Sequence, residues 1–505
     1  MYNVAEYLEN SARRYPDKTA VIDEKNSYTY AQLLKISRQT GSVLIEKKIH
    51  AQPVAVMMEK SADTLAAFLG IACSGNFYCL LNSQLPSYRL AQIQNVLQAG
   101  VVIIDDENDQ RANDLFPDAL ILKMDELKKA FIDEEKLIGI QKNTLDSDPL
   151  YINFTSGSTG NPKGVVVSHG SVIDFIDVFC DVFDFKSNEI FGNQAPFDFD
   201  VSVKDIYSSL KTGATLVIIP KHLFSQPSAL LDFLCEHQVT VMIWAVSALC
   251  LLTSFHALDY KVPHTVTKVL FSGEAMPMKH LHLWMHHLQN AMFVNLYGPT
   301  EITCNCTYHI IDRKNSYEKG LPIGRAFSNE KVFLLDDNGK EVKKAGITGE
   351  ICVGGRTVAS GYYNDEKQSA ERFFQNPLHH HYHERIYLTG DLGKYDEDGN
   401  LYFCGRKDFQ IKHMGHRIEL EEIEKHMAGM EGVDRCICVY DDEKKRLYAY
   451  YTGSCDKKEI YAYMKEKLPV YMIPNVIQRV EELKLNKNGK IDRSIYRKDL
   501  SSKKE

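Results

Sequence analysis

Short apolar runs alternate with amphipathic helical patterns through the first half of the chain, and this alternation limits the fold more than any other sequence feature. A helical pattern at residues 30–45 is one of the intervening stretches. The runs lie at residues 19–22, 54–58, 101–104, 215–219, 239–244 and 267–271. Strands separated by helices form largely parallel sheets that helices cover, so we expect an α/β fold.

The sequence changes character twice after this region. Between about 320 and 405, short strands alternate with Gly/Asp turns, which predicts a β-rich subdomain. Beyond Arg406 the chain becomes strongly charged, with helical patterns at 419–430 and 458–468 and β-type runs at 435–440 and 447–452. We therefore predict a large N-terminal domain, residues 1–407, and a small α+β C-terminal domain, residues 408–505.

Composition excludes several classes of protein. A formal net charge of −8 argues against nonspecific nucleic-acid binding. The twelve cysteines show no disulfide-framework spacing, which predicts reduced thiols. No apolar run approaches 18 residues and the first 20 residues do not resemble a signal peptide, so we expect a cytoplasmic protein without a membrane span.

A small-residue loop carries the main functional signal. Residues 154–170 read FTSGSTGNPKGVVVSHG, with apolar runs at 150–154 and 165–167, so we expect a loop between two strands. Glycine amides, hydroxyls and Lys163 are suited to binding phosphate. The loop differs from that of ordinary nucleotide hydrolases, because Pro162 stands where their second glycine should be.

The stretch TSGSTGNPKG resembles the phosphate-binding signature of the adenylate-forming superfamily, which includes acyl-CoA synthetases, luciferases and amino-acid adenylation domains. Further matching blocks follow in the family's order and cover nearly the whole chain. The resemblance implies ATP as substrate and Mg²⁺ as cofactor. It places these loop residues at the phosphates: Thr155, Ser156, Gly157, Ser158, Thr159, Gly160 and Lys163.

Two more blocks resemble nucleotide-binding motifs of the family. In NLYGPTEIT, residues 295–303, the resemblance gives Tyr297 to adenine, Thr300 to phosphate and Glu301 to Mg²⁺. In YLTGDLG, residues 387–393, it gives Asp391 to the ribose hydroxyls, a role suited to a doubly accepting carboxylate. It also assigns four further residues to the nucleotide: Gly273, Glu274, Asn295 and Gly298.

The C-terminal blocks imply a moving domain. GRKDFQIKHMGHRIELEEIE, residues 405–424, resembles the block whose arginine reaches the ribose, here Arg406, and whose next acid, Asp408, is the hinge. The resemblance also places Lys412 on the loop that faces the site during thioester formation. In LKLNKNGKIDR, residues 483–493, Lys490 matches the lysine that stabilises charge during adenylation; Lys487 is the neighbour most easily confused with it.

One aspartate points to an amino acid as the acid that is activated. NQAPFDFDVSVKDIYSSL, residues 193–210, resembles the block whose aspartate binds the α-ammonium group, here Asp200. Asp198 is the alternative carboxylate, on the same face if the segment is extended. The projected side-chain pocket consists of Val201, Lys204, Ile243, Leu270, Ser272, Leu296, Cys304 and Asn305.

Lys204 leaves the identity of the amino acid open. Leu270, Ser272 and Leu296 resemble pockets for small amino acids such as serine, cysteine, alanine or D-alanine. The wider frame resembles D-alanine–carrier protein ligases, from which Ser272 and Lys204 both depart. Lys204 either enters the pocket, where it could pair with an acidic substrate side chain, or pairs with an internal acid or extends outward.

The sequence therefore predicts an enzyme that forms an aminoacyl adenylate and transfers the aminoacyl group to the phosphopantetheine thiol of a carrier protein. The chain ends about twelve residues after Arg493 without a carrier domain, so we expect a carrier in trans. An acyl- or aryl-CoA synthetase is the alternative, against which Asp200 argues. A catalytically silent scaffold is a third hypothesis, disfavoured by the intact Lys163, Glu301, Asp391 and Lys490.

Overall fold

The computed structural model describes residues 1–157, 161–484 and 491–502. The chain divides into two compact units. Unit 1 comprises residues 1–83, 98–153 and 164–407, and unit 2 comprises residues 84–97, 154–163 and 408–505. The longest segment of unit 2 thus begins at Asp408, and two short segments from earlier in the chain belong to the same unit.

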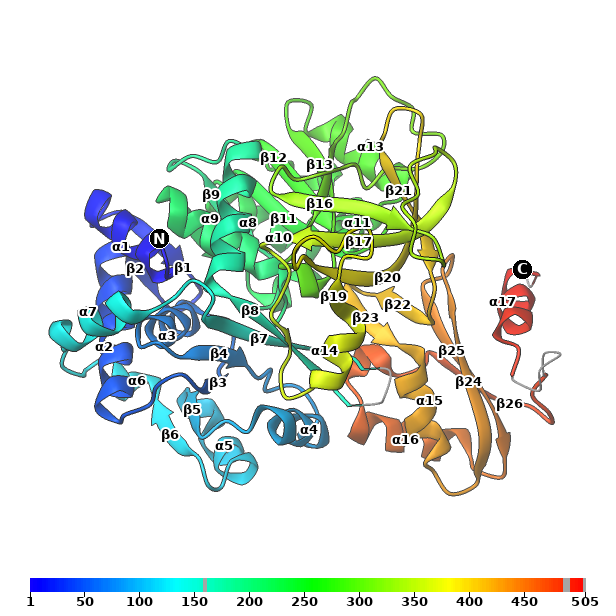
Figure 1. Ribbon diagram of the computed structural model, residues 1–505, viewed down its shortest axis with the longest axis horizontal. Helices are drawn as coiled ribbons and strands as arrows, with labels where there is room; N and C mark the ends of the chain where they lie inside the picture. The colour runs from blue at the N-terminus through cyan, green and yellow to red at the C-terminus, as the bar shows by residue number, and fades with distance from the viewer. Residues whose placement is uncertain (158–160, 485–490, 503–505) are drawn as a thin grey trace. The chain divides into compact units, whose positions relative to one another are not determined.

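The first large sheet has nine strands in the order β15-β14-β13-β12-β11-β9-β10-β1-β2. Strands β9, β11, β12 and β13 of this sheet are labelled in Figure 1. Its central strands are parallel, and β2, β14 and β15 add antiparallel edges. The strands are β1 (Thr19–Ile22), β2 (Ser27–Thr29), β9 (Ile190–Asn193), β10 (Thr215–Ile218), β11 (Val241–Ala245), β12 (Lys268–Ser272), β13 (Met292–Tyr297), β14 (Thr307–Ile310) and β15 (Arg325–Ala326).

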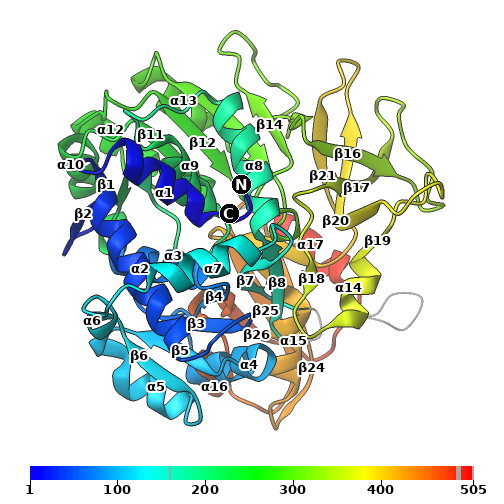
Figure 2. The same ribbon diagram turned by 60° about the vertical axis from the view of Figure 1, so that its left-hand side comes forward.

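The second large sheet has the order β18-β8-β7-β4-β3-β5-β6. Its strands β3, β5 and β6 lie side by side in Figure 2, and β3 is buried along its whole length, as parallel central strands require. The strands are β3 (Pro53–Met57), β4 (Phe77–Leu80), β5 (Val101–Ile104), β6 (Leu120–Lys123), β7 (Pro149–Thr155), β8 (Lys163–Ser168) and β18 (Gly361–Tyr362).

Helices of unit 1 fill the crossovers between these strands. Thr29 and Gln32 form a reciprocal capping box that starts α2, and Gly213, with φ of 74°, ends α9. The helices are α1 (Ala5–Arg14), α2 (Tyr30–Glu46), α3 (Ala62–Cys73), α5 (Asp109–Leu115), α6 (Met124–Leu127), α7 (Glu134–Asn143), α8 (His169–Val182), α9 (Val201–Thr212), α10 (Pro227–Glu236), α11 (Val246–Ser254), α12 (Ala257–Tyr260), α13 (Met278–His287) and α14 (Glu366–Arg372).

The β-rich subdomain is an antiparallel sheet. Its order is β16-β17-β20-β19, with β21 paired to β20, and the strands are β16 (Glu330–Leu335), β17 (Thr348–Gly355), β19 (Phe373–Gln375), β20 (Arg385–Tyr395) and β21 (Leu401–Arg406). Strand β18 lies in the same region of the sequence but is not part of this sheet. It pairs with β8, with Gly361 opposite Val166. No local sequence pattern indicates that pairing, because β18 is only two residues long.

Unit 2 contains a hairpin, a three-stranded sheet and four helices among its described residues. The strands are β22 (Gln410–His413), β23 (His416–Glu419), β24 (Val433–Asp441), β25 (Arg446–Gly453) and β26 (Val476–Arg479). The helices are α4 (Ser87–Leu97), α15 (Leu420–Ala428), α16 (Lys457–Lys467) and α17 (Arg493–Ser502). The helix and strand patterns predicted beyond residue 418 are confirmed to within a few residues at each end.

The predicted fold class is confirmed: two mainly parallel helix-covered sheets, a β-rich subdomain and a small α+β part. All twelve cysteines are free. Of the helices that the structure describes, none combines the length and the apolar character needed to cross a bilayer.

Candidate functional site

Asp391 is the centre of a buried polar cluster in unit 1. It lies on β20, directly opposite Arg406 on β21, and the Arg406 guanidinium forms an ion pair with Asp391 Oδ1. The hydroxyl of Tyr297, at the end of β13, donates a hydrogen bond of 2.5 Å to Asp391 Oδ2. Three residues that the sequence assigned to adenine and ribose therefore meet at one carboxylate.

Neighbouring groups hold this carboxylate in place. The Asp391 amide donates to Thr389 Oγ1 at 3.0 Å, and Arg406 Nη2 donates to the Thr389 carbonyl oxygen at 3.2 Å. Burial, followed by the charge of Asp391, raises the pKa of Tyr297 well above its usual value, so the phenol remains a donor. An ionised carboxylate has about four acceptor positions, so Asp391 can accept further hydroxyl donors such as those of a diol.

The segment after β13 is tightly folded. A methyl group on Gly298 would lie 2.5 Å from Asn305 Cα, so the backbone approaches itself too closely for a side chain. Thr303 and Cys304 both have positive φ, 56° and 78°, a backbone conformation that residues other than glycine rarely adopt. Such strain persists where the surroundings enforce it, commonly at functional sites.

Glu301 supplies a carboxylate suited to a hard cation. It is fully buried, and Oε1 accepts a hydrogen bond of 2.9 Å from the hydroxyl of Tyr362. In the described residues no cluster of three or more metal-ligating side chains occurs. One carboxylate nonetheless fits Mg²⁺, which is usually held by one or two carboxylates together with the phosphates of a substrate.

The residues projected onto the side-chain pocket lie near the start of α9. Lys204 Nζ donates to Asn305 Oδ1 at 2.7 Å and lies 3.4 Å from Ser272 Oγ. Cys304 Sγ lies 3.0 Å from the carbonyl oxygen of Asp200, the N-cap residue of α9. Burial and then the charge of Asp200 raise the pKa of the Cys304 thiol, which keeps it neutral.

The apolar pocket positions come from adjacent strands. Ile243 on β11 pairs with Leu270 on β12, and Leu296 lies on the next strand, β13. All three are buried in one core cluster that also contains Cys304, whereas Val201, at the start of α9, is only half-buried. The structure thus places all eight projected positions on α9, on three adjacent strands and on the segment after β13.

Asp198 and Asp200 have different surroundings. The residues before α9 form a turn, so the condition that would have placed both carboxylates on one face of an extended segment is not met. Asp198 Oδ2 accepts a hydrogen bond of 3.3 Å from Asn82, away from the pocket lysine. Of the two, Asp200 is the one whose charge acts on Cys304 and Lys204.

Tyr151 on β7 is a residue that sequence reasoning missed. It is fully buried, and its hydroxyl has no hydrogen-bond partner within the described part of the chain. Burial, followed by the charges of Cys304 and Asp200, raises its pKa well above the usual value, so the hydroxyl lies near the pocket. A tyrosine in an apolar strand carries no sequence signal for such a role.

The remaining nucleotide-site candidates of unit 1 lie on other segments of the chain. Gly273 follows β12 with φ of 99° and has open space where a side chain would lie. Glu274 and Thr300 are half-buried. Asn295 is buried and donates to the Pro322 carbonyl oxygen at 2.9 Å, so its amide is used structurally.

The small-residue loop is part of unit 2. Ser156 Oγ donates to the Arg417 carbonyl oxygen at 2.8 Å, and the buried Thr155 Oγ1 has no partner among the residues described. A methyl group on Gly157 would lie 2.0 Å from the Asn161 carbonyl oxygen. Lys163 begins β8. Ser158, Thr159 and Gly160 lie outside the described residues.

Unit 2 also holds the predicted hinge and the thioester-stage lysine. Asp408 is the first residue of its longest segment, and Lys412 lies on β22 of a hairpin that turns at Gly415, where φ is 81°. Lys490, predicted to act in adenylation, lies outside the described residues, as does Lys487.

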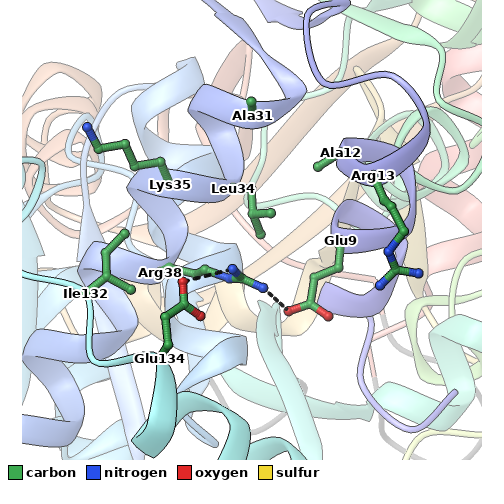
Figure 3. Close-up of a pocket in the computed structure, with 9 residues that line it drawn as sticks. All are labelled: Glu9, Ala12, Arg13, Ala31, Leu34, Lys35, Arg38, Ile132 and Glu134. Atoms are coloured by element: carbon green, nitrogen blue, oxygen red, sulfur yellow. Dashed lines mark hydrogen bonds and ion pairs between the residues drawn. The ribbon is translucent and has the colours of Figure 1, made fainter.

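A separate cavity of about 350 Å³ opens between α1, α2 and α7 (Figure 3). Arg38 extends into it and pairs with Glu9 at 3.2 Å and with Glu134 at 3.0 Å. These ion pairs join the charges of Arg38, Glu9 and Glu134, and the lining also includes Arg13 and Lys35. The lining includes no residue that the sequence assigned to the site.

Comparison with known proteins identifies the family. A profile described as AMP-binding enzyme matches residues 8–363, and a profile described as AMP-binding enzyme C-terminal domain matches residues 422–490. The chain belongs to the AMP-binding family of adenylate-forming enzymes. The resemblance to this family, predicted from the small-residue loop and the later motifs, is confirmed.

Similar proteins include parts of large synthases and one protein of similar length. Bacitracin synthase 1 of Bacillus licheniformis is 32% identical over 97% of this chain, which spans only 9% of that protein. Zwittermicin A synthase ZmaJ of Bacillus cereus is 32% identical over 97% of this chain and 94% of its own length. The structure of holo-PA1221, an NRPS protein containing adenylation and PCP domains, matches with a TM-score of 0.84 at 24% identity, over 98% of this chain and 84% of that one.

Proposed function

We propose that this enzyme activates an amino acid as its aminoacyl adenylate and then transfers the aminoacyl group to the phosphopantetheine thiol of a carrier protein. The observation that carries the proposal is the position of Asp200, a carboxylate at the start of α9 beside the buried Lys204 and Cys304. A carboxylate at this position can bind the α-ammonium group of an amino acid, which is the role that the motif implies for Asp200. The relatives among peptide synthases favour the same substrate class.

In the first step, a carboxylate oxygen of the amino acid attacks the α-phosphorus of ATP, and the bond to the departing pyrophosphate breaks. Asp391 would receive the ribose hydroxyls while Arg406 and Tyr297 keep the carboxylate oriented. The loop at 155–163 and Lys490 would donate to phosphate oxygens, in line with their motifs. Glu301 would hold Mg²⁺, which neutralises phosphate charge when bound.

In the second step, the carrier thiolate attacks the carbonyl carbon of the adenylate and AMP leaves. We propose that the small C-terminal domain, residues 408–505, turns about Asp408 between the steps, so that Lys412 replaces Lys490 at the site. We further propose that the carrier is a separate protein. The relative ZmaJ, which this chain matches over 94% of its length, supports a separate carrier. PA1221, in contrast, contains adenylation and PCP domains together in one protein.

Amino-acid-dependent exchange of pyrophosphate into ATP tests the proposal. The panel contains the proteinogenic amino acids and D-alanine, with aliphatic and aromatic acids that lack an amine as comparison. Exchange with an amino acid, its loss in Asp200→Asn and in Lys490→Ala, and impaired carrier loading in Lys412→Ala are the expected results. Exchange only with acids that lack an amine would instead identify an acyl- or aryl-CoA synthetase.

A further inference from the structure

Lys204 is a buried cation whose hydrogen-bond partners are uncharged. Its side chain is fully buried on α9, so it does not extend outward to solvent. The ammonium group has three donors, of which one reaches Asn305 Oδ1 at 2.7 Å and a second lies at the long distance of 3.4 Å from Ser272 Oγ. Both partners are uncharged and belong to the projected side-chain pocket.

The internal acid next to this lysine in the sequence, Asp205, is not its direct partner. Asp205 follows Lys204 on α9 and is also fully buried. Its Oδ2 accepts a hydrogen bond of 2.8 Å from Nδ2 of Asn193, which lies on β9. Asn193 in turn accepts from Lys60 Nζ, at 3.1 Å from its Oδ1. Lys204 forms no direct ion pair with a residue that the structure describes; Asp200 and Asp205 act on it only as nearby charges.

The charge of Asp205 is itself reduced by its surroundings. Burial raises the pKa of its carboxyl to about 7, against the opposing effects of Asn193 and the two lysines. Burial likewise lowers the pKa of Lys204. A buried ammonium group without a direct counter-ion is costly, and an anion placed against it recovers that cost.

The spacing of Asp200 and Lys204 suggests what that anion is. Residues four apart lie on the same face of a helix, so the two opposite charges project from one face at the start of α9. With the α-ammonium group at Asp200, the position at Lys204 is available to a second group of the same substrate. The α-carboxylate remains free to react with ATP.

We infer that the amino acid activated by this enzyme carries a carboxylate on its side chain, which binds Lys204 beside Asn305 and Ser272. This inference rests on the proposed function and names the substrate class of the same site. It selects the acidic alternative over the small neutral amino acids that Leu270, Ser272 and Leu296 also resemble. Two ion pairs then fix the substrate, one at Asp200 and one at Lys204.

Pyrophosphate exchange with matched substrates tests this inference. Aspartate and glutamate, in both stereoisomers, are compared with asparagine, glutamine, serine and alanine. We expect one acidic amino acid to exceed its own amide by about 100-fold in kcat/KM, because the amide leaves the buried ammonium group without a counter-ion. Lys204→Met should abolish that preference, because exchange with the acidic amino acid should fall to the level of exchange with its amide.

Lys211→Met is the matched control, because Lys211 lies on the same helix and pairs with Asp177 at the surface. It should leave the substrate preference unchanged. Exchange that is strongest with serine or alanine and equal in Lys204→Met would overturn the inference while leaving amino-acid activation intact. Exchange with no amino acid would overturn the proposed function itself. The wild-type substrate panel decides the question even if Lys204→Met does not fold.

Discussion

The hydroxyl of Tyr297 donates to the carboxylate of Asp391 across 2.5 Å, joining the end of β13 in the parallel sheet to β20 in the β-rich subdomain. Arg406 engages the other carboxylate oxygen from the adjacent strand. The carboxylate that we propose receives the ribose is thus held by two separate sheets of unit 1. Replacing either donor tests whether the carboxylate must be held rigidly.

Asp391→Asn should raise the KM for ATP by about 10- to 100-fold, because hydrogen bonds to a charged group contribute about 1.5–3 kcal/mol. Tyr297→Phe keeps the ring and loses one donor, so its effect should be smaller. Steady-state exchange kinetics at varied ATP measure both. Asp398→Asn, at an exposed turn beyond β20, is the control. An unchanged KM in Asp391→Asn would contradict the ribose role.

Glu330 should make the stability of unit 1 depend on pH. Its Oε1 accepts from Thr357 at 2.7 Å, its Oε2 has no partner among the described residues, and burial raises its pKa from 4.5 to about 8. The folded state therefore binds more protons than the unfolded state between these values. Its contribution to stability is full below about pH 4.5 and is lost as pH rises through 8.

Glu330→Gln should remove this dependence and raise the Tm at pH 8 relative to wild type. The difference between pH 5 and pH 8 has an upper bound of about 4 kcal/mol in the free energy of unfolding, because one proton changes it by at most about 1.4 kcal/mol per pH unit. Thermal unfolding across that range measures it. The exposed Glu397→Gln should follow the wild-type curve. Parallel curves for wild type and Glu330→Gln would show that Glu330 ionises normally in the folded protein.

Gly298→Ala should disrupt the pocket, whereas Gly139→Ala should not. The added methyl group would lie 2.5 Å from Asn305 Cα and 2.6 Å from the Cys304 carbonyl oxygen, both backbone atoms that cannot move independently. At Gly139, inside α7, nothing lies within 4 Å, so alanine should stabilise the helix by about 0.5–1 kcal/mol. Exchange activity and Tm are the measurements, and wild-type activity in Gly298→Ala would contradict the proposed packing.

The sequence predicted the strands and helices well because apolar periodicity directly reflects burial. Residues 19–22 and 101–104 are strands with the predicted bounds, and α2 differs by one residue. The resemblance also named Tyr297, Asp391 and Arg406, which the structure brings together. In such cases a local pattern or a motif is sufficient.

Other features depend on contacts between distant segments and leave no local pattern. Lys204 could be placed only once the partners on β12 and after β13, Ser272 and Asn305, were known. The sequence does not predict the turn before α9 that separates Asp198 from Asp200, because both extended and turned backbones suit its residues. Tyr151 went unnoticed because its hydroxyl matters only through what surrounds it.

The ion pair between Arg89 on α4 and Glu422 on α15 should stabilise unit 2 only as a pair. Arg89 Nη1 lies 2.5 Å from Glu422 Oε1, and the two side chains are 7% and 0% exposed. Burial raises the pKa of Glu422, and the charge of Arg89 opposes that rise. Removal of one partner leaves the other charge buried, which costs about 3–5 kcal/mol.

A double-mutant cycle with Arg89→Met and Glu422→Gln separates the two contributions. Each single variant should lower the free energy of unfolding, and the double variant should lose less than their sum by at least about 1 kcal/mol, because neither charge then remains unpaired. Urea unfolding measures the four proteins. Lys425→Met, at an exposed position of the same helix α15, is the control for substitution within that helix. Additive losses would show that Arg89 and Glu422 stabilise unit 2 independently.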